Sequence, residues 1–252
     1  MIAPDLDTAR WFIEQHGART PLCVAVTGAH AYGFPSEDSD LDLKAIHVAP
    51  TASILSLAPP PDTVDVITEF DGTEIDYTSH ELGFSLRLLI RGNGNMLERI
   101  LSPFQVYRSD RREWLQGLTR GVVCKKFHRH YRGFFGRVQQ DCKKAPVKTA
   151  KLYLYAYRSA LTGVHLLRTG QCVLDVEVLA QEYGYEAVPE LLAHKRGGAE
   201  HEPTEDVERY EADWPRLEAA LEGALHDSTL PDVPPNVEAL SAFLIEERRR
   251  AF

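Results

Sequence analysis

Three carboxylates stand where strands are expected, and together they could bind a divalent cation. Asp40 and Asp42 flank Leu41 at the start of an alternating apolar run, and Asp76 lies between Ile75 and Tyr77. Residues two apart on a strand point to the same face, about 7 Å apart along the chain. Because neighbouring carboxylates repel one another unless a cation lies among them, these oxygen-only ligands predict Mg²⁺ or Mn²⁺.

A glycine turn precedes the first two carboxylates. Gly28 ends the apolar run "PLCVAVTG", and the following "AHAYG" is predicted to begin a helix whose free N–H groups hold phosphate. His30, inside this turn, is a further candidate donor to phosphate. The order of strand, glycine turn and carboxylate strand is typical of phosphoryl transfer, in which two ions about 4 Å apart activate a hydroxyl and hold a triphosphate and its leaving pyrophosphate.

The elements that must position these residues can be predicted from periodicity. Residues 21–28 and 41–48 are expected to be strands, and residues 5–16 a packing helix. Asp71-Gly72 predicts a hairpin that carries Asp76 on its second strand. From residue 109 onward the pattern is almost wholly helical, so we expect an α/β domain over residues 1–105 and a helical domain over residues 106–252.

Composition limits the kind of protein this is. A net charge of −9 over 252 residues argues against a chain that coats nucleic acid everywhere, although a local basic patch remains compatible with it. The four cysteines are far apart and form no CxxC pair, which favours reduced thiols. No signal peptide or membrane span is predicted from the sequence, so the expected location is cytoplasmic, without a membrane partner.

Two groups of basic residues in the helical half are candidates for binding phosphates. Lys148, Lys151 and Arg158 share one helical arc with Tyr155, and this stripe is predicted to grip a triphosphate or an RNA backbone. The second group lies in "KKFHRHYRGFF", where cations alternate with aromatic rings as in single-strand nucleic-acid sites. Its candidate residues are Lys125, Lys126, Arg129, Tyr131 and Arg132. The same mixture also describes an amphipathic core helix with one wet face, and both interpretations stay open.

The glycine turn and the carboxylates resemble a known signature. Gly28 followed by Asp40-Leu41-Asp42, and later by Ile75-Asp76-Tyr77, is similar to the DNA polymerase beta-type nucleotidyltransferases. Within that superfamily, "GAHAYGFPSEDSDLDLKAIHV" resembles the RNA repair pathway DNA polymerase beta family. The resemblance covers residues 22–80 most strongly. It implies a small mixed β-sheet with helices, then an all-helical C-terminal domain, and Mg²⁺-dependent transfer of a nucleoside monophosphate from a nucleoside triphosphate.

The resemblance also implies roles for individual residues. Asp40 and Asp42 would be metal ligands, and Asp76 would bind the catalytic metal beside the attacking hydroxyl. Gly28, Ala29 and His30 would face the phosphates. The family usually has serine where this chain has Ala29, so one hydrogen bond of roughly 1 to 2 kcal/mol to the triphosphate would be missing while the backbone N–H groups remain.

The acceptor and two rival functions stay open. Family resemblance favours an RNA end, with an RNA ligase as a partner, but a protein or a small molecule with a hydroxyl would need the same catalytic core. One alternative is a non-catalytic module that binds RNA or a partner on the same fold. A metal phosphohydrolase is the other, although it usually adds histidine ligands that have no place here. A non-functional interpretation also stays open, in which Asp40 and Asp42 lie on a solvent-exposed strand face and Asp38 is a turn residue.

Overall fold

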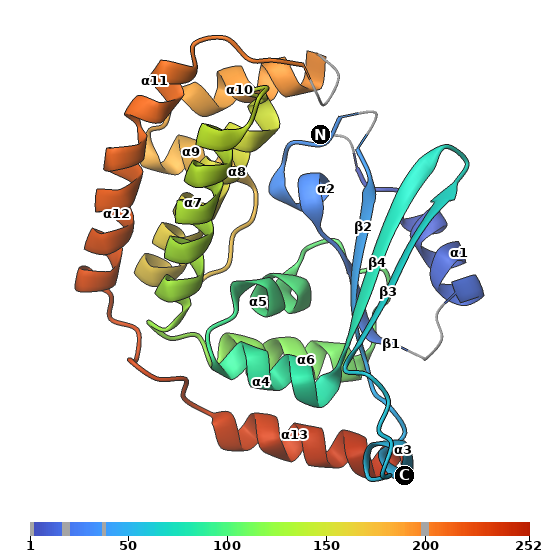
Figure 1. Cartoon of the computed structure of the whole chain (residues 1–252). Coiled ribbons are helices and arrows are strands. Elements are labelled where there is room, and N and C mark those ends of the chain that lie inside the picture. The colour runs from blue at the N-terminus through green and yellow to red at the C-terminus, as the bar shows by residue number, and fades with distance from the viewer. Residues whose placement is uncertain (1–2, 17–20, 37–38, 198–201) are drawn as a thin grey trace. The chain divides into compact units, whose positions relative to one another are not determined.

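The computed structural model describes residues 3–16, 21–36, 39–197 and 202–252. Within those ranges the chain forms two compact units (Figure 1). The sheet unit comprises Ala3–Gly28, Asp40–Val122 and Pro234–Phe252, and the helical unit comprises Ala29–Ser39 and Val123–Val233. Among the helices that the structure describes, none has the length and apolar character needed to cross a bilayer.

Each unit has its own set of elements. The sheet unit contains α1 (Leu6–His16), β1 (Pro21–Val26), β2 (Leu41–His47), α3 (Thr51–Ile54), β3 (Thr63–Phe70), β4 (Thr73–Glu81), α4 (Leu82–Ile90), α5 (Gly94–Leu101), α6 (Asp110–Arg120) and α13 (Val237–Arg250). The helical unit contains α7 (Phe127–Lys144), α8 (Ala150–Thr169), α9 (Val176–Tyr183), α10 (Ala187–Gly197), α11 (Val207–Ala212) and α12 (Trp214–Asp227). The short helix α2 (Gly28–Tyr32) starts at the last residue of a sheet-unit segment and continues into the helical unit.

The four-stranded sheet of the described residues has the order β1-β2-β4-β3. β2 runs parallel to β4, and the other two neighbouring pairs are antiparallel. The predicted hairpin is confirmed: β3 and β4 are joined through Asp71 and Gly72, both at positive φ (49° and 78°) as a two-residue hairpin turn requires. The sheet is therefore mixed, in agreement with the expected fold class.

Buried and partly exposed side chains alternate along β2 and β4, so the two faces of the sheet differ. Leu41, Leu43 and Ala45 of β2 are buried together with Ile75 and Tyr77 of β4, and α1 covers this face. In Figure 1, α4, α5 and α6 lie on the opposite side of the sheet from α1. Because the period of a strand is two, the residues between these apolar positions, Asp42 among them, face away from α1.

The division into units differs from the predicted boundary between residues 105 and 106. α6 packs against α5 and β1, and α13 packs against α4 and α6, so both belong to the sheet unit. Arg111 of α6 forms an ion pair with Glu246 of α13 at 3.0 Å. Residues 102–106 also stay with the sheet, because Val26 N donates to Phe104 O (2.8 Å) and Val106 N to Val24 O (2.9 Å) along the edge of β1.

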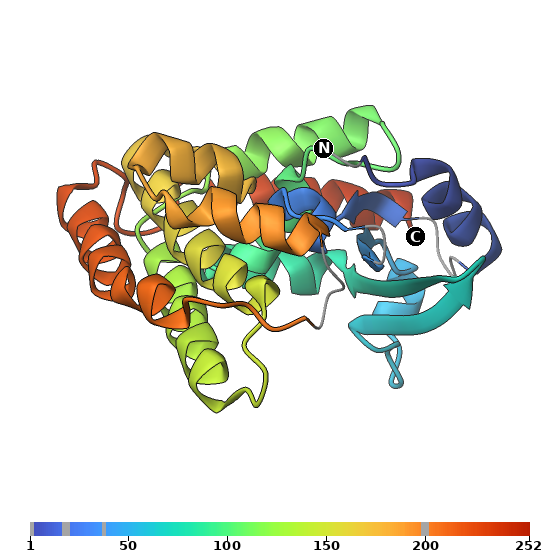
Figure 2. The same cartoon turned by 90° about the horizontal axis from the view of Figure 1, so that it is seen from above.

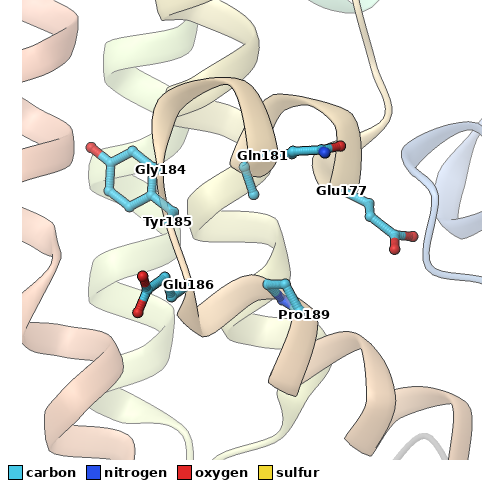
Figure 3. Close-up of a pocket in the computed structure, with 7 residues that line it drawn as sticks. Glu177, Gln181, Gly184, Tyr185, Glu186 and Pro189 are labelled. Atoms are coloured by element: carbon cyan, nitrogen blue, oxygen red, sulfur yellow. The ribbon is translucent and has the colours of Figure 1, made fainter.

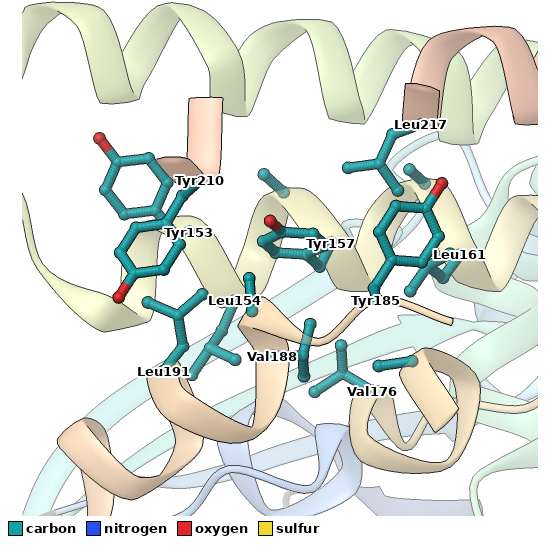
Figure 4. Close-up of a cluster of buried hydrophobic side chains, with 14 of the residues drawn as sticks. Tyr153, Leu154, Tyr157, Leu161, Val176, Tyr185, Val188, Leu191, Tyr210 and Leu217 are labelled. Carbon is teal, nitrogen blue, oxygen red and sulfur yellow. The ribbon is translucent and has the colours of Figure 1, made fainter. Parts of the chain in front are cut away.

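The helical unit is built around α8. This helix is buried over most of its length and contacts α7, α9, α10 and α12. Figure 4 shows its core, in which Tyr153, Tyr157 and Leu161 of α8 meet side chains of neighbouring helices. α7 and α8 run side by side, as both orientations show (Figures 1 and 2). Their close approach occurs at Gly163, where a Cβ would lie 2.6 Å from Cβ of Tyr131.

Candidate active site

The sheet brings Asp42 and Asp76 together. In the parallel pairing of β2 with β4, these two residues are direct partners in register. Both side chains project from the face opposite α1. Their neighbours along the strands, Leu41 and Leu43 in β2 and Ile75 and Tyr77 in β4, are buried under that helix. The carboxylates remain accessible to solvent, with 28% of the Asp42 side chain and 38% of the Asp76 side chain exposed.

A lysine lies between the two carboxylates. Lys44 follows Asp42 by two residues on the same face of β2. Its Nζ is 2.8 Å from Asp76 Oδ2 and 3.6 Å from Asp42 Oδ1. Nζ also lies 3.4 Å from the Asp76 carbonyl oxygen and 3.4 Å from Thr78 Oγ1. The pair of carboxylates therefore already holds one cation, supplied by the chain itself.

Gly28 lies directly against Asp42. Its φ is +61°, and a Cβ at this position would come 1.8 Å from Asp42 Oδ2. Thr27 N donates to the Asp42 carbonyl oxygen at 2.9 Å, which fixes the turn to the start of β2. Glycine is therefore favoured here for two reasons, the backbone conformation and the space that the Asp42 carboxylate occupies.

Asp40 is not part of a ligand cluster with the other two. It precedes β2 and is half-buried. Across the described ranges of the chain, no three His, Cys, Asp or Glu side chains come together in a group that could hold a metal ion. Asp38, predicted to be a turn residue, lies outside the described residues.

Two titratable side chains beside β2 and β4 are partly or fully withdrawn from water, Arg99 being buried and His80 half-buried. Arg99 of α5 donates to the Ala45 carbonyl oxygen of β2 at 2.9 Å, and burial lowers its pKa to about 10, so it stays protonated at neutral pH. His80 of β4 contacts Thr63 Oγ1 through Nδ1 at 3.0 Å. Burial, and then the nearby Arg99 charge, lower the pKa of His80 to about 4. His80 is therefore neutral near pH 7.

The segment after Gly28 is held within the helical unit. The helix expected from "AHAYG" is confirmed as α2, and the side chains of Ala29 and His30 are both buried. Ala29 belongs to the apolar core around α8, which suits a methyl group. Further along, Lys195 of α10 donates to Ser36 Oγ at 2.5 Å, and Arg196 donates to the Gly33 carbonyl oxygen at 3.0 Å.

The predicted stripe of Lys148, Lys151 and Arg158 needs correction. α8 begins at Ala150, so Lys148 precedes the helix; its Nζ donates to the Cys142 carbonyl oxygen and lies 3.7 Å from Glu211. Arg158 is 1% exposed, with its guanidinium 3.9 Å from the centre of the Tyr32 ring. A guanidinium enclosed by aromatic rings is not presented to a phosphate in solvent. Lys151 lies on α8 and is half-buried.

Of the two interpretations of this segment, the structure shows the amphipathic core helix, α7. Its buried residues, spaced three and four apart, include Phe127, Tyr131 and Phe135. The prediction that Tyr131 stacks on a base is wrong, because its side chain is fully buried. Arg132 is also engaged, since its guanidinium pairs with Glu218 and lies 3.2 Å from Glu222 of α12.

Lys125, another of the candidate nucleic-acid-binding residues, also forms an ion pair. Lys125 lies 3.1 Å from Asp232. Lys126 stands at the start of α7, and Arg129 is exposed. Lys125 and Arg132 therefore pair with carboxylates that follow them in sequence. The nucleic-acid role of Lys126 and Arg129 stays a prediction.

One pocket of the helical unit lies beside α9 and α10 (Figure 3). It has a volume of about 420 Å³ and is lined by Glu177, Gln181, Tyr185, Glu186 and others. Two carboxylates and no cation line it, so it is unsuited to a triphosphate.

Comparison with known proteins gives the family. A family model for the RNA repair pathway DNA polymerase beta family matches residues 5–246. The chain belongs to this family. The match extends well beyond the residues 22–80 that carry the sequence resemblance, and it covers most of both units.

Two curated relatives and one solved structure are similar to this family member. Uncharacterized protein MJ0002 of Methanocaldococcus jannaschii is 30% identical over 156 residues, which cover 62% of this chain and 63% of that protein, slightly less than two thirds of its length. Uncharacterized protein YcgL of Bacillus subtilis is 27% identical over 203 residues, covering 77% and 76%. A nucleotidyltransferase-like protein from Exiguobacterium sibiricum aligns over 98% of this chain and 77% of its own, at 14% identity and a TM-score of 0.35.

The residues present fit the divalent ion that the family resemblance implies. Asp42 and Asp76 supply oxygen ligands, and they already hold a cation in the form of the Lys44 ammonium. Mg²⁺ is usually bound by one or two carboxylates together with substrate phosphates, so a pair of carboxylates is a sufficient protein contribution. Lys44 is the residue that sequence reasoning missed; its two-residue spacing from Asp42 was the available signal.

Proposed function

We propose that this protein is a Mg²⁺-dependent nucleotidyltransferase that transfers a nucleoside monophosphate from a nucleoside triphosphate to a hydroxyl at an RNA end. The observation that carries the proposal is the direct register of Asp42 with Asp76, beside a glycine whose Cβ position is taken up by the Asp42 carboxylate. The family, with its description as an RNA repair family, supports the choice of RNA.

In the proposed reaction, the acceptor oxygen bonds to the α-phosphorus and the bond from that phosphorus to the bridging oxygen breaks. Pyrophosphate leaves, and the hydroxyl proton passes to Asp76 or to water. A bound Mg²⁺ would neutralise phosphate charge and lower the pKa of the attacking hydroxyl. Asp42 and Asp76 would hold that ion, and Gly28 would allow the phosphates to approach the backbone.

The test is transfer of label from each of four α-labelled nucleoside triphosphates to RNA with free 3′ hydroxyls, with Mg²⁺ or Mn²⁺ present. We expect labelled RNA and stoichiometric pyrophosphate with the wild type, and a loss of at least about 10³-fold in Asp42→Asn/Asp76→Asn. Asp65→Asn is the matched control, because Asp65 is an exposed aspartate of the same sheet outside the carboxylate pair.

Other outcomes would redirect or refute the proposal. If label appears in protein or in a small molecule instead of RNA, the proposed nucleotidyl transfer stands but the acceptor is not RNA. Binding of RNA without any transfer that depends on Asp42 and Asp76 would refute the enzymatic proposal and favour a non-catalytic binding module.

A further inference from the structure

The cation between Asp42 and Asp76 is the starting observation. Lys44 Nζ makes its shortest contact to Asp76 Oδ2, 2.8 Å, and a longer one to Asp42 Oδ1, 3.6 Å. The Lys44 side chain is 19% exposed, less than either carboxylate. Contacts at 3.4 Å to the Asp76 carbonyl oxygen and Thr78 Oγ1 further fix its position over the parallel pair of strands.

The register of the two aspartates favours a counter-ion between them. Strands in a sheet lie about 4.8 Å apart, so two aspartates in direct register on one face bring like charges close together. An ammonium is a compact charge on a flexible stem, which can move away from one carboxylate without leaving the other. Lysine therefore suits a role in which the same position is neutralised by the chain at one time and by a bound ion at another.

We infer that Lys44 is the resident counter-ion of the candidate active site: its ammonium keeps Asp42 and Asp76 positioned in the absence of a divalent ion, and it competes with that ion for them. Lys44 is thus a positioning residue. The competition rests on the proposed function, whereas the counter-ion role rests on the contacts alone. Removal of the ammonium should destabilise the metal-free protein and tighten metal binding.

The first experiment compares Lys44→Met with the wild type, because methionine keeps most of the side-chain length and removes the charge. Calorimetric titration with Mn²⁺ alone, without nucleotide, should give a dissociation constant about 3- to 10-fold lower in the variant. Without metal, its Tm should be about 2 to 5 °C lower, and saturating Mn²⁺ should close most of that gap. Lys144→Met, at an exposed position of α7, should change neither quantity. An unchanged or weaker Mn²⁺ affinity in Lys44→Met overturns the competition.

The second experiment separates the counter-ion from the metal. In an Asp76→Asn background, Lys44→Met should lower the metal-free Tm by less than half as much as it does in the wild type, because one of the repelling charges is already gone. Equal losses in the two backgrounds would overturn the counter-ion role. If neither wild type nor Lys44→Met binds Mn²⁺, the competition and the metal dependence of the proposed function both fail, and this cycle still decides the counter-ion role.

Discussion

At the scale of single residues, the candidate site depends on a backbone position that strongly favours glycine. Gly28 has a positive φ, and the space where its Cβ would stand is filled by the Asp42 carboxylate. Gly72 in the β3–β4 turn has a similar φ of +78°, with no atom within 4 Å of its Cβ position. Substituting each glycine by alanine therefore distinguishes the free-energy cost of the backbone conformation from that of displacing the Asp42 carboxylate.

Gly28→Ala should lower the free energy of unfolding by about 2 to 3 kcal/mol, and Gly72→Ala by about 1 kcal/mol. Both variants carry the strain of a positive φ, but only Gly28→Ala must also move Asp42. Denaturant unfolding measures the two losses. Equal losses would mean that Asp42 moves aside without cost.

His80 should make stability depend on pH. Its pKa is lowered to about 4 in the folded protein, chiefly by burial, against about 6.5 in the unfolded chain. Between these values the unfolded state binds the proton, so stability is complete above pH 6.5 and falls as pH drops towards 4. After allowance for partial exposure, the loss is about 1 to 2 kcal/mol.

Denaturant unfolding of His80→Gln from pH 7.5 to 4 tests this dependence. The pH profile should become flatter in this window than that of the wild type. His226→Gln, in which an 89% exposed side chain is replaced, should leave the profile unchanged. A profile for His80→Gln as steep as that of the wild type would assign the dependence to other groups.

At the scale of elements, α7 and α8 form a close helix pair whose geometry depends on one small residue. A Cβ on Gly163 of α8 would meet Tyr131 of α7 at 2.6 Å and Leu221 of α12 at 2.8 Å. Gly133, on α7, has nothing within 4 Å of its Cβ position. The phase of α7 that buries Tyr131 is the same phase that leaves Arg129 exposed.

Gly163→Ala should destabilise the protein by about 1 to 3 kcal/mol, because an added methyl group forces the helices apart. Gly133→Ala should stabilise it by about 0.5 to 1 kcal/mol through helix propensity alone. Thermal unfolding gives both signs. A stabilising Gly163→Ala would show that the interface can open without loss of packing.

At the scale of the whole molecule, neither unit is continuous in sequence. The sheet unit includes the C-terminal helix α13, whose Arg248 contacts Glu81 at the end of β4 at 2.6 Å. Thr51 Oγ1 donates to the Arg248 carbonyl oxygen at 2.5 Å. α13 therefore packs in the same unit, the sheet unit, as segments from the N-terminal half of the chain.

Removal of residues 234–252 should weaken the sheet unit selectively. We expect faster amide hydrogen exchange in α4 and α6, against which α13 packs, and little change in the α8 core. Mass spectrometry of the exchanged protein measures both. Equal loss of protection in α8 would contradict the assignment of α13 to the sheet unit.

Much of the sheet could be predicted because its signals are local. Alternation over residues 41–47 and 75–77 fixes which side chains share a face, and the Asp71-Gly72 pair fixes the turn. Those features arise from the two-residue period of a strand and the preference of Gly for positive φ, which depend on residues close in sequence. The aspartates of β2 and β4 were therefore recognisable as candidate ligands.

Contacts between distant residues were decided only by the tertiary structure. Lys44 looked like an ordinary strand residue until the β2–β4 pairing placed Asp76 beside it. Arg158 and Tyr131 had types suited to binding, but helix packing buried both. The sequence alone determined where strands, turn and carboxylates lie, since short-range periodicity specifies them. The structure decided which charges are paired or buried. This depends on packing between segments far apart in the chain, and the sequence pattern of one segment does not specify which other segment packs against it.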